Sequence, residues 1–175
     1  MADYRIILCG GGPIAQATGR LLDRMDFEVL HVAPFSDSAG RRRWEGVTRR
    51  VVVAYKELTE RLTLDRRDFV VIATRTLETD LDCLRQALRS EAGLIGLVSS
   101  RSRWRGILKT LQKEGVSARD LKRVRCPAGL DIGSVTTDEI GLSIVAQLVQ
   151  ERAARLFGKS ASKGRPSPAK SAKPS

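Results

Sequence analysis

Short apolar runs alternate with helical patterns over most of the chain. The run at 68–74 is the clearest strand, because it is apolar without alternation, as expected for a parallel strand that is covered on both faces. Further strands are predicted at 4–9, 28–32, 50–54 and 94–98, with a short edge strand at 124–126.

Apolar residues three and four positions apart predict the helices between these strands. The first helix, at 13–25, is expected to bury Ile14, Ala17, Leu21 and Met25. A helix capped by Thr76 and ending near Arg89 is expected to bury Leu77, Leu81, Leu84 and Leu88. Other helices are predicted at 56–62, at 99–113, as a single turn from Ser117, and at 137–157 after the capping box Thr136-Thr137-Asp138-Glu139.

Strands that alternate with helices predict an α/β fold, here a Rossmann-like, doubly wound parallel sheet in a single domain. The expected strand order is 3-2-1-4-5, with a possible sixth strand. The domain should span residues 1–158. Residues 159–175 are rich in Lys, Ser, Pro and Ala, a composition that predicts a disordered basic tail.

The net charge of +11 raises the question of nucleic acid, but five of the basic residues lie in the tail, which has no acid. The remaining excess of +6 is spread along the chain among only eight aromatic residues, so nucleic acid is not the expected partner. No apolar run approaches the roughly 20 residues of a membrane span. The three cysteines lie far apart without a C-x-x-C motif, and no signal peptide is visible, so a cytoplasmic protein is expected.

The first predicted strand ends at three glycines, Gly10, Gly11 and Gly12, and a helical pattern follows at once. With Pro13 and Ala15 this stretch fits the G-x-G-x-x-G/A dinucleotide fingerprint. Glycines allow a tight turn and a close approach of backbone N–H groups to a pyrophosphate, and the helix N-terminus favours an anion. The turn is therefore a candidate cofactor site.

Ligands of open parallel sheets bind at the carboxyl ends of the strands, near the reversal of strand order. Besides the glycine turn, the candidates there are Thr74, Arg75, Ser100, Arg101, Gly129, Asp131 and Gly133. Arg75 and Arg101 suit a phosphate, or they pair with Glu78 or Asp80. Asp131 contacts a ribose or a metal, or it only holds a tight turn.

Few side chains are suited to catalysis. Cys126 is the one candidate for a catalytic or sulfur-carrying group, because a flanking Arg125 would lower its pKa, although free cysteines are usually small buried hydrophobes. Cys9 and Cys83 are expected in the core, and Asp80 as a structural acid in the first turn of a helix. His31, the single histidine, is expected to be partly buried and bonded to the backbone. With no metal cluster and no catalytic triad, a binding protein is favoured over an enzyme.

The later motifs are similar to those of a known family. Gly129-Leu130-Asp131-Ile132-Gly133, with Cys126-Pro127 before it and Thr137-Asp138-Glu139-Ile140 after it, resembles the signature of the XdhC/CoxI family. The segments at 94–98, with Ser100-Arg101, and at 70–80 resemble that family too. The resemblance covers most of residues 4–152, and only the C-terminal, Rossmann-type domain of longer members.

This resemblance implies an accessory protein for a molybdenum hydroxylase such as xanthine dehydrogenase or carbon monoxide dehydrogenase. Family members are thought to bind the molybdenum cofactor, protect it during sulfuration and insert it into the target. For this chain it implies a pterin dinucleotide bound across the glycine turn and the loop 129–133. The implied partner is the apo-enzyme, or a protein that carries the missing family domain, and a homodimer is an open alternative.

Departures from the family pattern keep two other functions open. The family commonly has an acid at the end of the second strand, which would hold a ribose 2′-OH, whereas this chain has Ala33 and Pro34. Arg41–Arg43 either face the 2′-phosphate of NADP or form a solvated surface. Histidines that are frequent in the family are replaced by Arg75, Leu77 and Arg125. The alternatives are an NAD(P)-dependent oxidoreductase or redox sensor, and a scaffold that binds a partner without a small ligand.

Overall fold

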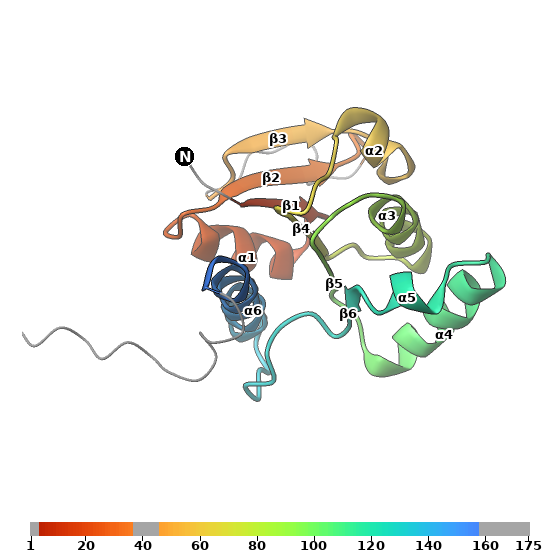
Figure 1. Ribbon diagram of the computed structural model, residues 1–175. Helices are drawn as coiled ribbons and strands as arrows, with labels where there is room; N and C mark the ends of the chain where they lie inside the picture. The colour runs from red at the N-terminus through yellow and green to blue at the C-terminus, as the bar shows by residue number, and fades with distance from the viewer. Residues whose placement is uncertain (1–3, 37–45, 158–175) are drawn as a thin grey trace, which may run out of the picture.

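The computed structural model describes residues 4–36 and 46–157. Six parallel strands form one sheet in the order β3-β2-β1-β4-β5-β6 (Figure 1), which confirms the expected order and the sixth strand. The strands are β1 (Arg5–Cys9), β2 (Glu28–Ala33), β3 (Arg49–Val52), β4 (Asp68–Ile72), β5 (Leu94–Leu97) and β6 (Val124–Arg125).

Helices cover both faces of this sheet, as in a doubly wound fold. The helix α1 (Pro13–Leu22) and the long helix α6 (Thr137–Phe157) lie side by side on one face (Figure 1). The other helical segments are the 3-10 turn η2 (Tyr55–Glu57), α2 (Leu58–Arg61), α3 (Leu77–Arg89), α4 (Arg101–Lys113) and α5 (Ala118–Leu121). None of the helices within the described ranges is both long and apolar enough to cross a bilayer.

The sheet separates two apolar cores, because successive side chains of a strand point to opposite faces. Ile6 and Leu8 of β1 pack into the core beneath α1 and α6. Ile7 and Cys9 pack into the core beneath α2, α3, α4 and α5, where Cys9 meets Cys83. These four side chains of β1 are fully buried, as expected for a central parallel strand.

Two details of the predicted helix faces are wrong. Met25 is 40% exposed because α1 ends at Leu22, and the buried residues of α1 are Ala15, Ala17, Thr18, Gly19 and Leu22. Small residues are buried because α6 lies close: a Cβ added to Gly141 would be 3.0 Å from the Cβ of Ala17. Leu77 is also exposed, since it is the first residue of α3, although Leu81, Leu84 and Leu88 are buried as predicted.

An ion pair between a partly exposed arginine and a buried carboxylate ties β1 to β4. Arg5 donates from Nε to Asp68 Oδ1 at 2.6 Å and from Nη2 to Asp68 Oδ2 at 2.7 Å. Asp68 has a fully buried side chain, and its Oδ2 also accepts the backbone N–H of Asp65 at 2.6 Å. Removing one member of a buried, hydrogen-bonded pair leaves the other uncompensated, which costs more than the pair itself contributes.

We expect Asp68→Ala to lower the free energy of unfolding by about 2–4 kcal/mol, because the Arg5 guanidinium and the Asp65 N–H lose their acceptor. Urea denaturation followed by circular dichroism measures the change. Glu91→Ala is the matched control, since Glu91 pairs with Arg66 at 3.7 Å and both side chains are largely exposed. The control should cost less than about 0.5 kcal/mol, and equal losses in the two variants would contradict this role of Asp68.

Candidate functional site

The turn after β1 contains two glycines with different roles. Gly10 has a φ of +106°, and a Cβ there would collide with the backbone of Ala73, so packing within the chain requires glycine. Gly12 is the N-cap of α1 with an ordinary φ of −71°, and no described atom lies within 4 Å of a Cβ placed on it. The described part of the protein therefore does not itself require a glycine at 12, which leaves room for a ligand.

Side chains hold the carbonyl groups of this turn. His31 is buried on β2, and its Nε2 donates to the carbonyl of Gly10 at 3.0 Å, which confirms the expected backbone bond. Gln16 Nε2 donates to the carbonyl of Gly11 at 3.0 Å. Pro13 is the first residue of α1 and has no N–H, so the turn has one donor fewer for an anion than most nucleotide-binding turns.

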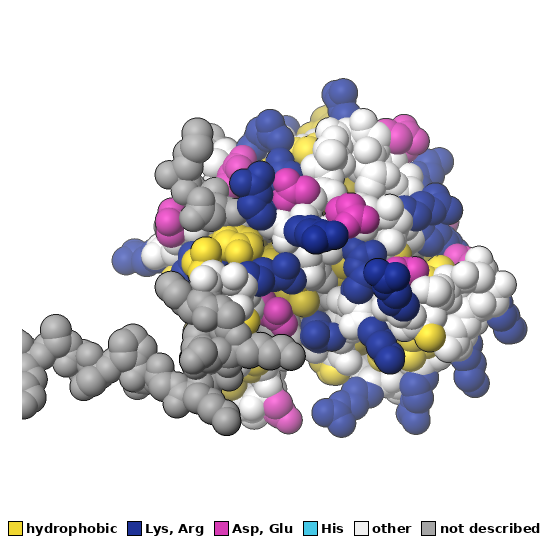
Figure 2. Space-filling model, in the orientation of Figure 1, with side chains coloured by type: hydrophobic (Ala, Val, Ile, Leu, Met, Phe, Trp, Pro, Cys, Tyr) yellow, Lys and Arg dark blue, Asp and Glu magenta, His cyan; other side chains and the backbone are white. Residues whose placement is uncertain are grey.

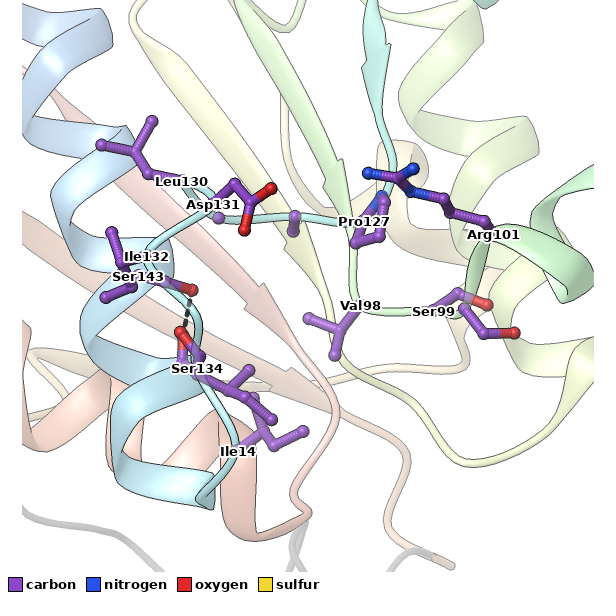
Figure 3. Close-up of a pocket in the computed structure, with 14 residues that line it drawn as sticks. Ile14, Val98, Ser99, Arg101, Pro127, Leu130, Asp131, Ile132, Ser134 and Ser143 are labelled. Atoms are coloured by element: carbon purple, nitrogen blue, oxygen red, sulfur yellow. Dashed lines mark hydrogen bonds between the residues drawn. The ribbon is translucent and has the colours of Figure 1, made fainter.

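A pocket of about 530 Å³ lies beside this turn, a size typical of small-molecule sites (Figure 3). It is formed by the chain that leaves β5, the loop 127–134, and the first turns of α1 and α6. Its lining residues are Ile14, Val98, Ser99, Ser100, Arg101, Pro127, Ala128, Gly129, Leu130, Asp131, Ile132, Ser134, Ile140 and Ser143.

The loop 127–134 forms one side of this pocket because α6 holds it. Gly129 has a φ of +108°, and a Cβ there would collide with the side chain of Ser143. The N–H of Gly129 donates to Gln147 Oε1 at 2.9 Å, and that of Leu130 donates to the Ser143 carbonyl at 3.1 Å. The predicted capping box then begins α6, since Glu139 Oε2 accepts the N–H of Thr136 at 2.8 Å and Thr136 Oγ1 accepts that of Glu139 at 3.3 Å.

Two charged groups face each other across the apolar pocket. Arg101, the first residue of α4, and Asp131, in the loop, lie on opposite sides of it (Figure 3). Both are exposed, and neither has a hydrogen bond or an ion pair with any residue in the described ranges. The alternative in which Asp131 only accepts backbone hydrogen bonds is therefore not what the structure shows.

The pocket also offers polar groups beside Arg101. Ser99 Oγ is buried and has no hydrogen-bond partner among the described residues. Ser100 is the N-cap of α4, where its Oγ accepts the N–H of Arg103 at 3.1 Å. The first turn of α4 contains no acid that would offset the positive end of the helix dipole. This end of the dipole therefore adds to the positive charge of Arg101. This side of the pocket favours an anion, and the apolar walls suit a flat ring.

The structure brings only some of the predicted residues together. Ser100, Arg101, Gly129 and Asp131 line the pocket. The residues outside its lining are Gly10, Gly11, Gly12, Pro13, Ala15, Thr74, Arg75, Gly133 and Cys126. Thr74 Oγ1 donates to Asp80 and accepts from Thr79 Oγ1, so this hydroxyl serves the start of α3, while Arg75 is exposed and unpaired among the described residues. Arg41–Arg43 lie outside the described residues.

The apolar lining was missed by the sequence analysis. Ile14, Val98, Ile132 and Ile140 each lie within a few residues of a predicted site residue, yet their patterns predict only core or surface. Their position beside the motifs was the available signal.

Asp80 is a structural acid, as expected, but with an unexpected partner. Its side chain is 2% exposed, and Oδ2 accepts from Arg103 Nη2 at 2.7 Å. Arg103 therefore forms the ion pair that was considered for Arg75 or Arg101. Burial raises the pKa of Asp80 above its usual value, partly offset by hydrogen bonds from Thr74 and Arg103 and by the charge of Arg103.

The expectation that Arg125 activates Cys126 is wrong. The thiol is half-buried, and burial raises its pKa to about 11, with a further contribution from the negative charge of Asp80. Its Sγ lies 3.7 Å from the carbonyl oxygen of Ser99, to which it donates. Cys126 is therefore a neutral thiol at physiological pH, unsuited to be a nucleophile or a sulfur carrier. The described residues also include no group of three or more His, Cys, Asp or Glu that could hold a metal.

We expect Cys126 to be alkylated by iodoacetamide at pH 8 about 100-fold more slowly than glutathione, because its thiolate fraction is that much smaller. The rate should rise about tenfold per pH unit and level off only near pH 11. Mass spectrometry of the Cys126 peptide in the folded protein measures this rate, and Cys9 and Cys83, both fully buried, are internal controls. A plateau below pH 9 would contradict the raised pKa.

Comparison with known proteins supports this fold. A curated relative, the uncharacterized protein YqeB of Escherichia coli K12, is 24% identical over 147 residues, which are 83% of this chain and 27% of that protein. The crystal structure of a protein described as a xanthine dehydrogenase, from Bacillus halodurans, matches with a TM-score of 0.74 and 24% identity over 87% of this chain and 44% of that chain. This chain thus spans less than half the length of either relative.

The family comparison covers the domain that contains the pocket. Residues 6–148 match the XdhC Rossmann domain, from β1 into α6, and include the glycine turn, Arg101 and the loop 127–134. This match confirms the resemblance of the motifs at 70–80, 94–101 and 126–140 to the XdhC/CoxI family. The chain belongs to the XdhC family, and its residues 6–148 correspond to the Rossmann domain of that family.

Proposed function

We propose that this protein takes part in the maturation of a molybdenum hydroxylase of the xanthine dehydrogenase type, and that its pocket holds the organic part of a molybdenum cofactor dinucleotide. The observation that carries the proposal is the pocket between Arg101 and Asp131, because the family motif at 129–133 forms one of its sides. Membership of the XdhC family and the fold of the Bacillus halodurans protein support the maturation role.

The residues of the pocket fit the chemistry of such a ligand. Arg101 and the N-terminus of α4 would hold a phosphate, since a guanidinium and free backbone N–H groups both favour an anion. Val98, Ile132 and Ile140 would pack against a flat ring, and Asp131 would accept hydrogen bonds from pterin or base N–H groups. The open space at Gly12, next to Ile14, would accept the second half of a dinucleotide.

The molybdenum centre is cargo in this proposal, held through its pterin. Cys126 is a neutral thiol outside the pocket lining, so no bond from this cysteine to the metal is proposed. The protein would bind and deliver the cofactor, and the chemistry of molybdenum would belong to the target enzyme. The partner is the apo-enzyme, or a protein that carries the part of the longer relatives that lies outside this chain.

The first test is cofactor retention. The protein is co-expressed in a molybdenum-replete host, purified without oxygen, and examined by mass spectrometry for a pterin dinucleotide. We expect Arg101→Gln to weaken retention about 10- to 100-fold, because a charge-assisted hydrogen bond to phosphate is lost. Arg75→Gln is the control, since Arg75 is also exposed but lies outside the pocket lining, and this variant should retain the cofactor like the wild type.

Titration with NADH and NADPH tests the alternative function, an NAD(P)-dependent oxidoreductase or redox sensor. Under the proposal, neither nucleotide should bind at micromolar concentration. For NADH the reason is also local, because β2 ends in Ala33 and offers no carboxylate to the ribose 2′-OH. Tight NADPH binding without any retained pterin would contradict this proposal and favour the oxidoreductase or redox sensor.

The glycine turn has its own test. We expect Gly12→Asp to abolish maturation of the target hydroxylase, because the new carboxylate would occupy the space at the turn and repel a phosphate. The fold should tolerate the change, since no described atom lies within 4 Å of the new Cβ, and the thermal midpoint checks this. If hydroxylase activity in the host survives Gly12→Asp, the turn has only an architectural role and the dinucleotide is not bound across it.

A further inference from the structure

The positive charge of the domain is concentrated beside the pocket. Residues 101–125 contain nine Lys or Arg and two Asp or Glu, a net charge of +7. Because residues 1–158 carry +6 in total, the rest of that region is close to neutral. The expectation that the excess charge is spread along the chain is therefore wrong. Figure 2 shows Lys and Arg side chains gathered along the lower edge of the molecule, where Figure 1 places α4.

Four of these cations form a row along α4. Arg101, Arg105, Lys109 and Lys113 follow one another at intervals of four residues, and all are exposed. Residues four apart lie on the same side of an α-helix, and at 1.5 Å per residue this row, the α4 basic row, is about 18 Å long. It begins at the pocket, because Arg101 lines it.

The two acids of this segment are already paired. Glu114 accepts from Arg85 Nε at 3.0 Å and from Arg85 Nη2 at 2.6 Å. Asp120 accepts from Ser117 Oγ at 2.7 Å and lies 4.0 Å from Arg123. No member of the α4 basic row forms an ion pair with any residue that the structure describes.

The row does not serve the stability of α4. Each pair of like charges four residues apart costs a helix about 0.2–0.5 kcal/mol, and the row contains three such pairs. Arg101 also lies at the N-terminus, where the helix dipole disfavours a cation. An anionic surface bound to the row would offset this cost.

The opposite side of the pocket exposes apolar side chains. Ile132, which lines the pocket, is 51% exposed, and Val135, three residues later in the segment that leads into α6, is 84% exposed. Figure 3 shows Ile132 on the loop side and Arg101 across the pocket from it. The mouth of the pocket thus has a basic rim and an apolar rim.

We propose that these two rims form a docking surface for a protein partner whose complementary surface is acidic with an apolar patch, so that the partner covers the mouth of the pocket. Exposed apolar groups beside a charged row are typical of a protein interface, in which apolar contacts contribute affinity and charges guide association. The identity of the partner rests on the proposed function, which makes it the molybdenum hydroxylase apo-enzyme.

Nucleic acid fits this surface less well. Trp104 is the one aromatic residue of 101–125, and it packs partly buried against the core, so it offers no stacking platform for bases. Ile132 and Val135 have no role in contacts to phosphates. A second copy of this chain is disfavoured by charge, because a symmetric contact would bring two basic rows together.

The test reverses the charge of the row without touching the pocket. The variant Arg105→Glu, Lys109→Glu and Lys113→Glu leaves Arg101 intact, and Glu is as good a helix former as the residues it replaces. The control Arg50→Glu, Lys56→Glu and Arg61→Glu makes the same change of charge at the opposite, β3 edge of the sheet, with exposed residues that form no ion pair within the described ranges. Both variants are measured in biolayer interferometry against the apo-hydroxylase and against a 20-base-pair DNA duplex, at 50 and 300 mM salt.

We expect the wild type and the control to bind the apo-hydroxylase, and the row variant to bind it at least about tenfold more weakly at 50 mM salt. Ile132→Ser with Val135→Ser should weaken binding at both salt concentrations, since apolar contacts are not screened. Unchanged binding by the row variant, absence of wild-type binding to the apo-hydroxylase, or tighter binding to DNA than to protein would each overturn the docking surface. Retention of the pterin dinucleotide, measured on the same preparations, reports separately on the proposed function.

Discussion

The architecture depends on the tight passage of the chain at Gly10. Packing against Ala73 leaves no space for a side chain there, and this turn sets where α1 begins. Helix α1 in turn holds α6 through the close approach of Ala17 and Gly141. Helix α6 then holds the loop 127–134 through Ser143 and Gln147. Close backbone contacts at Gly10, Gly141 and Gly129 thus connect the first strand of the sheet to the side of a pocket formed more than a hundred residues later.

The chemistry of the pocket follows from which polar groups are already used. Asp80 accepts hydrogen bonds from Thr74 and from Arg103 at the start of α3, and burial keeps Cys126 neutral. Arg101 and Asp131 are left without partners in the described structure, on opposite sides of an apolar space. The pocket therefore presents one free cation and one free carboxylate, among the described residues, on opposite sides of apolar walls.

The order of elements could be predicted from the sequence because local rules decide it. The apolar run at 68–74 and the caps at Thr76 and Thr136 are consistent with the fold they form. Buried faces were less predictable. Met25 continues the apolar spacing of α1, but the helix ends at Leu22 and the Met25 side chain is 40% exposed. The pocket could be predicted only in part, because its position beside the loop 127–134 depends on tertiary contacts. Tertiary contacts also decide that Arg103, and not Arg101, pairs with Asp80.

The two rims of the pocket have a consequence for how a bound molecule can leave. Arg101 and Ile132 both line the pocket and are both exposed to solvent, so they belong to the wall and to the outer surface at the same time. A protein seated across these rims would separate the contents of the pocket from bulk water. A bound molecule would then leave the pocket toward the docked protein. A labile molecule would pass from this pocket to that protein without being free in solution.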